Sequence, residues 1–389
     1  MQIYLDHSAT TPTRLEAIAS MQTILLSEWG NPSSIHQWGE RASIAIEQAR
    51  FQVAALINAN PDAIAFTSGG TEANNQAIMG VANLYSTPQH LIISSVEHSS
   101  ISAPIKFLET RGWSITRLGV DFQGRINPQD LAAAIRPNTA LVSIIYAQSE
   151  VGTIQPIAEL AAICRHNQVY FHTDAVQAAG RIAIDVQQLG IDLLSLSSHK
   201  LYGPQGTGAL YIRPGIELVP LLAGGGQEMG WRSGTQAVPQ IAGFGTAAEL
   251  ASEELDSESA RLIGLRDRLY THLAHCPILV PTGDRLHRLP HHLSFYLKIP
   301  HSHSKEAITG KTIVRQLNLA GIGISSGAAC SSGKTTPSPI LLAMGYSQTE
   351  AVAGIRISLG RSTTEADIDW VAMALKQIID RLIPKLICV

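Results

Sequence analysis

The stretch AFTSGGTEANN, residues 65–75, decides the fold class of this 389-residue chain. It reads as an apolar strand, a glycine-rich turn and the start of a helix, which is how a βα unit begins. Free backbone N–H groups and the helix dipole make such a turn a candidate anion site, and Thr71 adds a hydroxyl group. A plain tight turn has the same composition, so this motif alone favours neither interpretation.

Short β-rich runs alternate with helical stretches around this unit. The strands predicted here lie at 63–67, 91–95, 140–146, 169–172, 193–196 and 208–212. This alternation predicts an α/β fold with a mostly parallel sheet covered on both faces. The elements predicted after it are a long amphipathic helix at 249–275, strands at 278–281, 293–297 and 355–359, and a helix at 366–382. We therefore expect a large α/β domain at 15–255 and a smaller α+β domain formed by 1–14 and 256–389.

Composition places the chain among ordinary globular proteins. It is 45% hydrophobic and 15% charged, and Lys+Arg 28 against Asp+Glu 31 gives a formal net charge of −3. This balance argues against a nucleic-acid or anionic-membrane surface. No apolar run reaches the roughly 18 residues of a membrane span, and the start MQIYLDHSATT lacks a signal-peptide pattern. We expect a cytoplasmic protein.

Charged side chains follow two of the predicted strands. Asp174 comes after the strand at 169–172, and Lys200 follows the strand at 193–196 and precedes a Gly/Pro-rich turn. Ligands of open α/β sheets bind beyond the carboxyl ends of the strands. A helix cap for the aspartate and an exposed position for the lysine are the simpler readings of each residue alone. Together with the turn at 65–75, they match the requirements of a pyridoxal phosphate (PLP) site: an amine, an acid and a phosphate cradle.

Competing nucleotide motifs fail on spacing. The chain has no GxGxxG pattern, and its two Gly-Lys-Thr triplets, at 310–312 and 333–335, lack the upstream glycine of a P-loop. The sequence therefore gives little support to ATP binding.

Four cysteines occupy different contexts. Cys164, Cys276 and Cys388 lie in apolar or terminal segments, whereas Cys330 lies among small and polar residues in GISSGAACSSGK, residues 323–334. The spacing predicts neither a disulfide framework nor a cysteine zinc site. An exposed thiol in a glycine-rich loop can react as a thiolate, so Cys330 is the candidate nucleophile.

With these motifs the chain closely resembles the cysteine desulfurases, the NifS/IscS-like, class-V aminotransferase branch of the fold-type I PLP enzymes. The similarity runs from YLDHSATTP at residues 4–12 to IRISLGR at residues 355–361. Its most specific segments are SHKLYGP at 198–204 and SSGAAC at 325–330.

The resemblance implies PLP as cofactor and a role for individual residues. Lys200 would form the Schiff base, and Asp174 would pair with the pyridine nitrogen. The other implied cofactor contacts are Gln177 and Ser149 at the ring hydroxyl, His98 stacked on the ring and transferring protons, Gly70, Thr71, Ser197 and His199 at the phosphate, and Thr235 at the phosphate of a neighbouring subunit. Asn31 and Arg356 would clamp the substrate carboxylate, as a fork-shaped guanidinium suits.

The implied reaction removes sulfur from L-cysteine, leaving L-alanine and a persulfide on Cys330. A homodimer is implied, as is a sulfur acceptor such as an iron–sulfur scaffold or a sulfur carrier. Two alternatives remain open. One is another PLP enzyme on this fold, such as a C–S lyase, a selenocysteine lyase or an aminotransferase; the other is a non-catalytic relative that keeps the fold.

The chain departs from the family pattern at two places that bear on the site. Ser149 stands where relatives have an asparagine near the ring hydroxyl. A family asparagine is also missing from a histidine-rich segment that contains His287, His291, His292, His301 and His303. We interpret this segment as an exposed, variable loop and expect no metal site, although a histidine-bound metal is the minor alternative.

Overall fold

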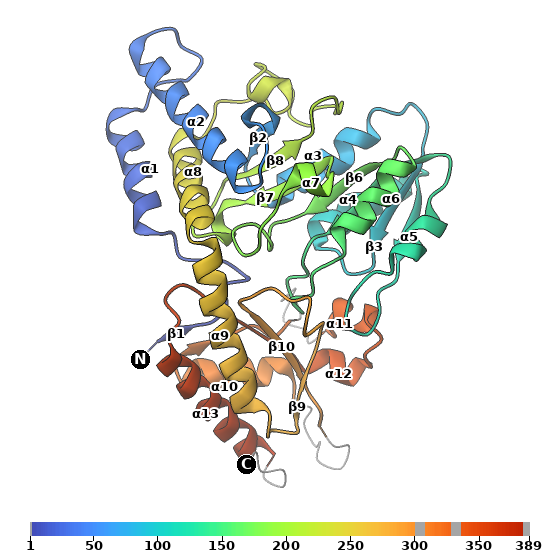
Figure 1. Cartoon of the computed structure of the whole chain (residues 1–389), viewed down its shortest axis with the longest axis vertical. Helices are drawn as coiled ribbons and strands as arrows, with labels where there is room; N and C mark the ends of the chain where they lie inside the picture. The colour runs from blue at the N-terminus through green and yellow to red at the C-terminus, as the bar shows by residue number, and fades with distance from the viewer. Residues whose placement is uncertain (1, 300–307, 328–335, 384–389) are drawn as a thin grey trace.

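A computed structural model describes residues 2–299, 308–327 and 336–383 of the chain. In this part of the chain, a seven-stranded sheet forms the upper body in Figure 1, and a second group of strands and helices lies below it. The sheet order is β2-β8-β7-β6-β5-β3-β4. Its strands are β2 (Ile64–Thr67), β3 (His90–Ser94), β4 (Ser114–Leu118), β5 (Thr139–Ile145), β6 (Tyr170–Asp174), β7 (Leu193–Ser197) and β8 (Gly208–Ile212).

The sheet is mostly parallel, which confirms the predicted fold class. Strands β4, β3, β5, β6 and β7 pair in parallel, while β8 runs antiparallel to both β7 and β2. Each predicted strand is present within a residue or two of its expected bounds. The edge strand β4 was not predicted because its residues are mostly polar and half-exposed, so it lacks the apolar run of a buried parallel strand.

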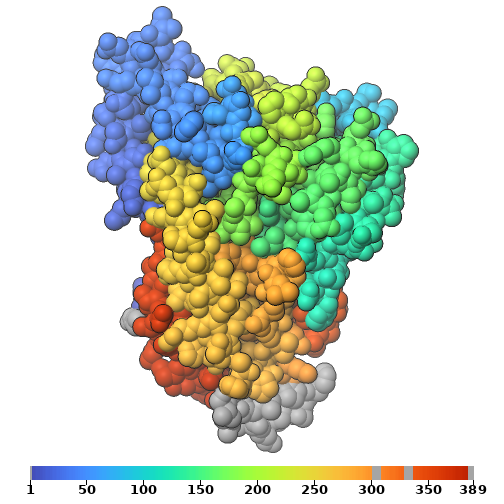
Figure 2. Space-filling view, viewed as in Figure 1, coloured from blue at the N-terminus to red at the C-terminus, as the bar shows by residue number. Residues whose placement is uncertain are grey.

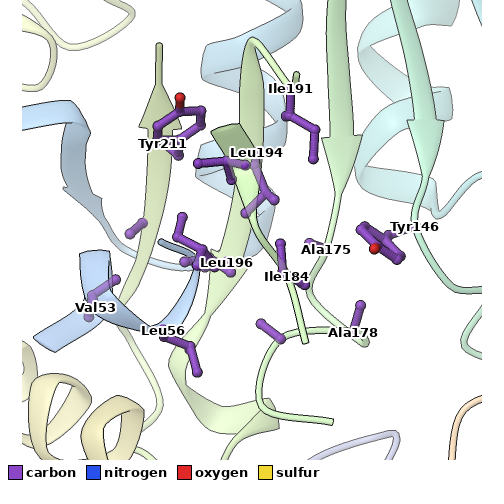
Figure 3. Packing of buried hydrophobic residues seen from close by; sticks show 14 of the residues in the cluster. Val53, Leu56, Tyr146, Ala175, Ala178, Ile184, Ile191, Leu194, Leu196 and Tyr211 are labelled. Carbon is purple, nitrogen blue, oxygen red and sulfur yellow. The ribbon is translucent and has the colours of Figure 1, made fainter. Parts of the chain in front are cut away.

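Helices cover both faces of this sheet. Side chains alternate along β7, so Leu194 and Leu196 join one buried cluster and Leu193 joins another on the opposite face. Figure 3 shows Leu196 close to Val53 and Leu56. The helices of the upper body are α1 (Leu15–Ser27), α2 (Gln37–Leu56), α3 (Gly70–Ala82), α4 (Ser99–Thr110), α5 (Pro128–Ala134), α6 (Ile157–His166), α7 (Val186–Leu189) and α8 (Val238–Glu253).

The lower group has its own hydrophobic cluster, which includes the buried side chains of Leu269, Phe295 and Leu375. It also receives the N-terminus, because β1 pairs in parallel with β11. Its elements are β1 (Ile3–Tyr4), α9 (Leu255–Leu273), β9 (Leu279–Pro281), β10 (His292–Leu297), α10 (Gly310–Leu319), β11 (Ile322–Gly323), α11 (Pro339–Ala343), α12 (Gln348–Val352), β12 (Gly354–Ser358) and α13 (Glu365–Leu382). In Figure 1, α9 descends from the end of α8 into this group.

One expectation about the secondary structure needs correction. The single helix predicted at 249–275 is two helices, because α8 ends at Glu253 and α9 begins at Leu255. Cys164 is a free, buried thiol, as its apolar context indicates. Among the described residues, no helix is both long and apolar enough to cross a membrane.

Candidate functional site

A cavity of about 720 Å³ opens beyond the carboxyl ends of β5, β6 and β7, where parallel sheets bind ligands. Side chains from both groups of elements line it. The predicted site residues in its lining are Gly70, Thr71, His98, Ser149, Asp174, Gln177, Ser197, His199, Lys200 and Arg356.

Lys200 ends the short 3₁₀ turn that follows β7. Its Nζ donates hydrogen bonds to the carbonyl oxygens of Ser8, at 2.7 Å, and Ala9, at 2.6 Å. Burial is the main cause that lowers the pKa of the Lys200 amine to about 8, and the charge of Arg356 adds to it. The N-terminal segment therefore holds an amine that loses its proton more readily than an ordinary lysine.

Asp174 is the last residue of β6, and it is buried. Its Oδ2 accepts a hydrogen bond from Asn74 Nδ2 at 2.8 Å, and its Oδ1 accepts one from the Val176 backbone N–H at 3.0 Å. Burial raises the pKa of the Asp174 carboxyl, and these two donors, with the charge of Lys200, oppose the rise. A cationic ring nitrogen beside this carboxyl would favour its charged form further.

The glycine-rich turn at 65–75 lies at one end of the cavity. Gly69 has φ +151°, and helix α3 begins at Gly70. A Cβ atom on Gly70 would lie 2.7 Å from Val176 Cγ2 and 3.4 Å from Ser197 Cβ. Only glycine leaves this space open, so the helix N-terminus forms a cradle into which an anion can enter.

His199 lies beside this cradle, and its Nδ1 is 3.0 Å from Thr10 Oγ1. Burial and the nearby Lys200 charge lower the pKa of His199 to about 4. The imidazole is therefore neutral near pH 7 and can serve the site as a hydrogen-bonding group.

Arg356 projects into the cavity from β12 of the lower group. Its Nη2 lies 2.6 Å from Asp6 Oδ1, and its Nη1 donates to the Ser149 carbonyl at 3.1 Å. Its Nε is buried with no hydrogen-bond partner among the described residues. The guanidinium is thus already oriented and keeps donor capacity for a ligand carboxylate.

Gln177 and Ser149 make contacts that their expected ring-hydroxyl role does not include. Gln177 Nε2 donates to the Ser8 carbonyl at 2.9 Å. The Ser149 carbonyl accepts from Arg356 and lies 3.0 Å from His292 Nε2.

Three predicted residues are absent from the described lining of this cavity. Asn31 is exposed between α1 and α2, where its Oδ1 accepts from the Ser33 backbone N–H at 3.0 Å. Thr235 is exposed in the segment before α8. Cys330 lies outside the described residues.

The histidine-rich segment differs from its expectation. His291 and His292 are buried next to and within β10, not exposed in a loop, because other segments pack against their rings. His291 Nε2 lies 3.4 Å from Ser8 Oγ, and His292 Nε2 lies 3.0 Å from the Ser149 carbonyl oxygen. Burial lowers the pKa of both rings well below the usual value. His301 and His303 lie outside the described residues, and in the described part of the chain no cluster of His, Cys, Asp or Glu could hold a metal ion.

Sequence reasoning missed two buried carboxyl groups in the cavity lining, Glu97 and Glu150. Glu97 Oε1 accepts from the Ile145 backbone N–H at 2.9 Å, and burial raises the pKa of this carboxyl to about 8. Burial also raises the pKa of Glu150 to about 7, against the lowering effects of Ser338 and Arg356. Their position beside His98 and Ser149 in the sequence was the available signal, but burial cannot be read from an acidic residue alone.

Comparisons with known proteins agree with this geometry. The aminotransferase class-V family matches residues 3–371. A cysteine desulfurase IscS of Dictyoglomus turgidum is 45% identical over 383 residues, which cover 98% of this chain and 95% of the relative. A NifS-like protein from Rickettsia africae has a structure with TM-score 0.87 and 32% identity, covering 98% of this chain and 100% of its own. The structure of SspA in complex with cysteine has TM-score 0.80 and 36% identity, covering 92% and 99%.

Proposed function

The chain belongs to the aminotransferase class-V family and is a cysteine desulfurase, and from this premise we propose how its residues divide the work. The observation that carries the assignment is the meeting of four features in one cavity: the Lys200 amine, the Asp174 carboxyl, the open cradle at Gly70 and the Arg356 guanidinium. Each matches one part of a PLP-bound amino acid.

The residues present fit PLP. The cradle that a Cβ on Gly70 would fill suits the phosphate, and the buried Asp174 suits the ring nitrogen. Lys200 lines the same cavity, and its amine would hold the cofactor by bonding to the aldehyde. When bound, PLP supplies that aldehyde and an electron-withdrawing ring that stabilises negative charge on the substrate α-carbon.

The chain's own residues orient the substrate and move its protons. Arg356 binds the α-carboxylate through two parallel donors, which fixes the amino acid relative to the ring. Lys200, with its pKa lowered to about 8, is partly neutral near pH 7 and can accept a proton from the α-carbon. His98 faces the same cavity from the start of α4.

Cys330 is the residue we assign to the sulfur. Its thiolate attacks the sulfur of the substrate, and the electron pair of the broken C–S bond stays with the carbon that loses sulfur. That carbon takes up a proton, and the α-carbon regains the proton that Lys200 accepted. The products are L-alanine and a persulfide on Cys330. A sulfur-acceptor protein, an iron–sulfur scaffold or a sulfur carrier, then removes the outer sulfur, and a cytoplasmic location suits a thiol that must stay reduced between cycles.

A homodimer is supported by the surface of α1 and α2, which form the upper left of the molecule in Figure 2. The exposed apolar side chains of this region include Leu25, Leu26, Trp29, Ile35, Ile44 and Phe51. A monomer rarely exposes so much apolar surface in one region. Thr235, which is exposed and away from its own cavity, is assigned to the phosphate of the second subunit, and Asn31 to the substrate clamp once the dimer forms.

The division into a large domain, 15–255, and a small domain, 1–14 with 256–389, is supported by the separate hydrophobic clusters of the two groups. The cavity then lies between the domains, with Lys200 on one and Arg356 on the other. Placement of substrate and cofactor clamps on different domains suits a site that must release one product and retain the sulfur.

The test is turnover of L-cysteine by the holoenzyme and by Cys330→Ser, with Cys164→Ala as a control for loss of an ordinary buried thiol. We expect Cys330→Ser to bind PLP normally yet to form neither persulfide nor sulfide efficiently, while Cys164→Ala remains active. Undiminished sulfide and alanine release by Cys330→Ser would show that the chain acts instead as a C–S lyase.

A further inference from the structure

Two buried side chains connect Asp174 to His98. Asn74 Nδ2 lies 2.8 Å from Asp174 Oδ2 and 2.8 Å from Ser100 Oγ. Ser100 Oγ in turn lies 2.7 Å from His98 Nδ1. Asn74 is 1% exposed and Ser100 6% exposed, so water does not compete for these bonds. The chain of contacts spans β6, α3 and the start of α4.

The direction of each hydrogen bond follows from the donors available. A charged Asp174 carboxylate can only accept, so the amide nitrogen of Asn74, and not its oxygen, faces it. The second hydrogen of that nitrogen points to Ser100 Oγ, which therefore accepts. The hydroxyl hydrogen of Ser100 is then left to donate to His98 Nδ1.

A second donor reaches the same nitrogen. The backbone N–H of Ser100 donates to His98 Nδ1 at 3.2 Å, because His98 is the N-cap residue of α4. A neutral imidazole has one protonated nitrogen and one acceptor nitrogen. Since Nδ1 receives two hydrogen bonds, the proton of the neutral ring must be on Nε2.

We propose that Asn74 and Ser100 are positioning residues that hold His98 in its Nε2–H tautomer, with Nδ1 as the acceptor. This inference rests on the proposed function, because the charge of Asp174 at one end sets the direction of the whole chain of bonds. It assigns His98 the part of a hydrogen-bond donor toward the cavity, and leaves acceptance of the α-proton to Lys200.

Nitrogen-15 NMR of histidine-labelled protein tests the proposal without relying on turnover. Long-range ¹H–¹⁵N couplings report which ring nitrogen carries the proton, and comparison with His98→Gln identifies the His98 signals. We expect the Nε2–H tautomer in the holoenzyme. In Ser100→Ala, which removes one of the two donors, the Nδ1 resonance should shift toward the value of a less hydrogen-bonded nitrogen.

Ser102→Ala is the matched control, because Ser102 is exposed on the same helix. It should leave the His98 signals unchanged. The proposal would be overturned by an Nδ1–H tautomer in the wild-type holoenzyme, or by an Nδ1 chemical shift that is the same in Ser100→Ala as in the wild type. Should Ser100→Ala fold poorly, Asn74→Ala offers a second route, since it removes the donor that orients the Ser100 hydroxyl.

Kinetics provide an independent reading. Loss of one hydrogen bond to His98 should lower kcat for L-cysteine by about two- to tenfold, while KM stays unchanged because the side-chain hydrogen bonds of Ser100 go to His98 and Asn74 and not to Arg356. A rise in KM with constant kcat would contradict a role through His98. Failure of the desulfurase assignment would appear in Cys330→Ser, whereas failure of this inference would appear in the tautomer, so the two are distinguishable.

Discussion

Arg356, which lines the cavity, forms an ion pair with Asp6, with 2.6 Å between Nη2 and Oδ1. The two residues are 350 positions apart in the chain and meet because the N-terminal strand β1 joins the lower group beside β11. Asp6 holds the guanidinium in place before any substrate arrives. A substrate carboxylate must therefore share or take over donors that Asp6 and the Ser149 carbonyl already orient.

Arg356→Lys keeps the positive charge but loses the fork of donors. Hydrogen bonds to charged groups contribute enough that KM for L-cysteine should rise about tenfold or more, with a smaller change in kcat. Steady-state kinetics measure both. Arg117→Lys is the control, because Arg117 forms an exposed pair with Glu109 far from β12. An unchanged KM would remove Arg356 from the substrate clamp.

Lys200 should make the stability of the cofactor-free protein rise with pH. Burial lowers the pKa of its amine to about 8, whereas the unfolded chain holds that proton up to about 10.4. Between these two pKa values the unfolded state binds more protons than the folded state, so the free energy of unfolding increases with pH. Below pH 8 the destabilisation caused by burying the Lys200 amine is constant.

Lys200→Met removes this contribution. It should raise the melting temperature of the cofactor-free protein most at pH 7, and the gain should shrink by pH 10. Lys106→Met on exposed α4 should change little at either pH. A separate experiment uses the PLP-loaded proteins. After reduction with borohydride, the wild type should gain the mass of PLP, whereas Lys200→Met should not. Equal melting shifts at both pH values would show that the amine titrates normally.

Glu97 should make the free energy of unfolding fall as pH rises, which is opposite to the effect of Lys200. Burial raises the pKa of its carboxyl to about 8 from an ordinary value near 4.5. The folded state then holds a proton that the unfolded state loses, so the free energy of unfolding falls as pH rises from 4.5 to 8. Glu97→Gln should flatten this slope and leave turnover at pH 7 nearly intact, since the amide imitates a neutral carboxyl. Denaturant titrations at pH 5, 7 and 9 measure the free energy of unfolding, and Glu159→Gln, at an exposed position, is the control. The same pH dependence in Glu97→Gln as in the wild type would contradict the prediction.

Gly70→Ala should weaken PLP binding. Its Cβ would lie 2.7 Å from Val176 Cγ2, inside the phosphate cradle, and overpacking of this kind should increase the PLP dissociation constant about tenfold. Fluorescence titration of the cofactor-free protein measures the constant. Gly264→Ala on α9 is the matched control, because its Cβ meets nothing within 4 Å. Equal affinity in the two variants would place the phosphate elsewhere.

If the chain forms a dimer through α1 and α2, charged substitutions on this surface should halve the mass of the particle in solution. Ile44 and Phe51 are both exposed on α2, by 61% and 60%. Replacing both with aspartate should leave the fold intact, because neither side chain is buried in the monomer, and should shift the species seen by light scattering from dimer to monomer. Exposed Leu286→Asp, in the lower group, is the control. A monomeric wild type would contradict the assignment of Thr235 to a neighbouring site.

Much of the fold could be predicted because its signals are local. The apolar runs of β5, β6 and β7 are long enough to identify buried parallel strands, and Asp174 and Lys200 follow two of them directly. The prediction was wrong at 249–275, where periodicity continued across the break at Glu254, and at His291 and His292, where polar residues proved to be buried. Burial of a polar group depends on what packs over it, which a single segment does not encode.

The sequence by itself determined the α/β class, the resemblance to cysteine desulfurases and ten of the residues that line the cavity, because short motifs encode local backbone shape and chemistry. Only the tertiary structure decided which side chains meet. Asn74 reaches Asp174 across 100 positions, and Asp6 reaches Arg356 across 350. Such contacts follow from the order of the strands and from the N-terminal strand joining the distant β11. They set the tautomer of His98 and the orientation of the substrate clamp, which no stretch of sequence specifies alone.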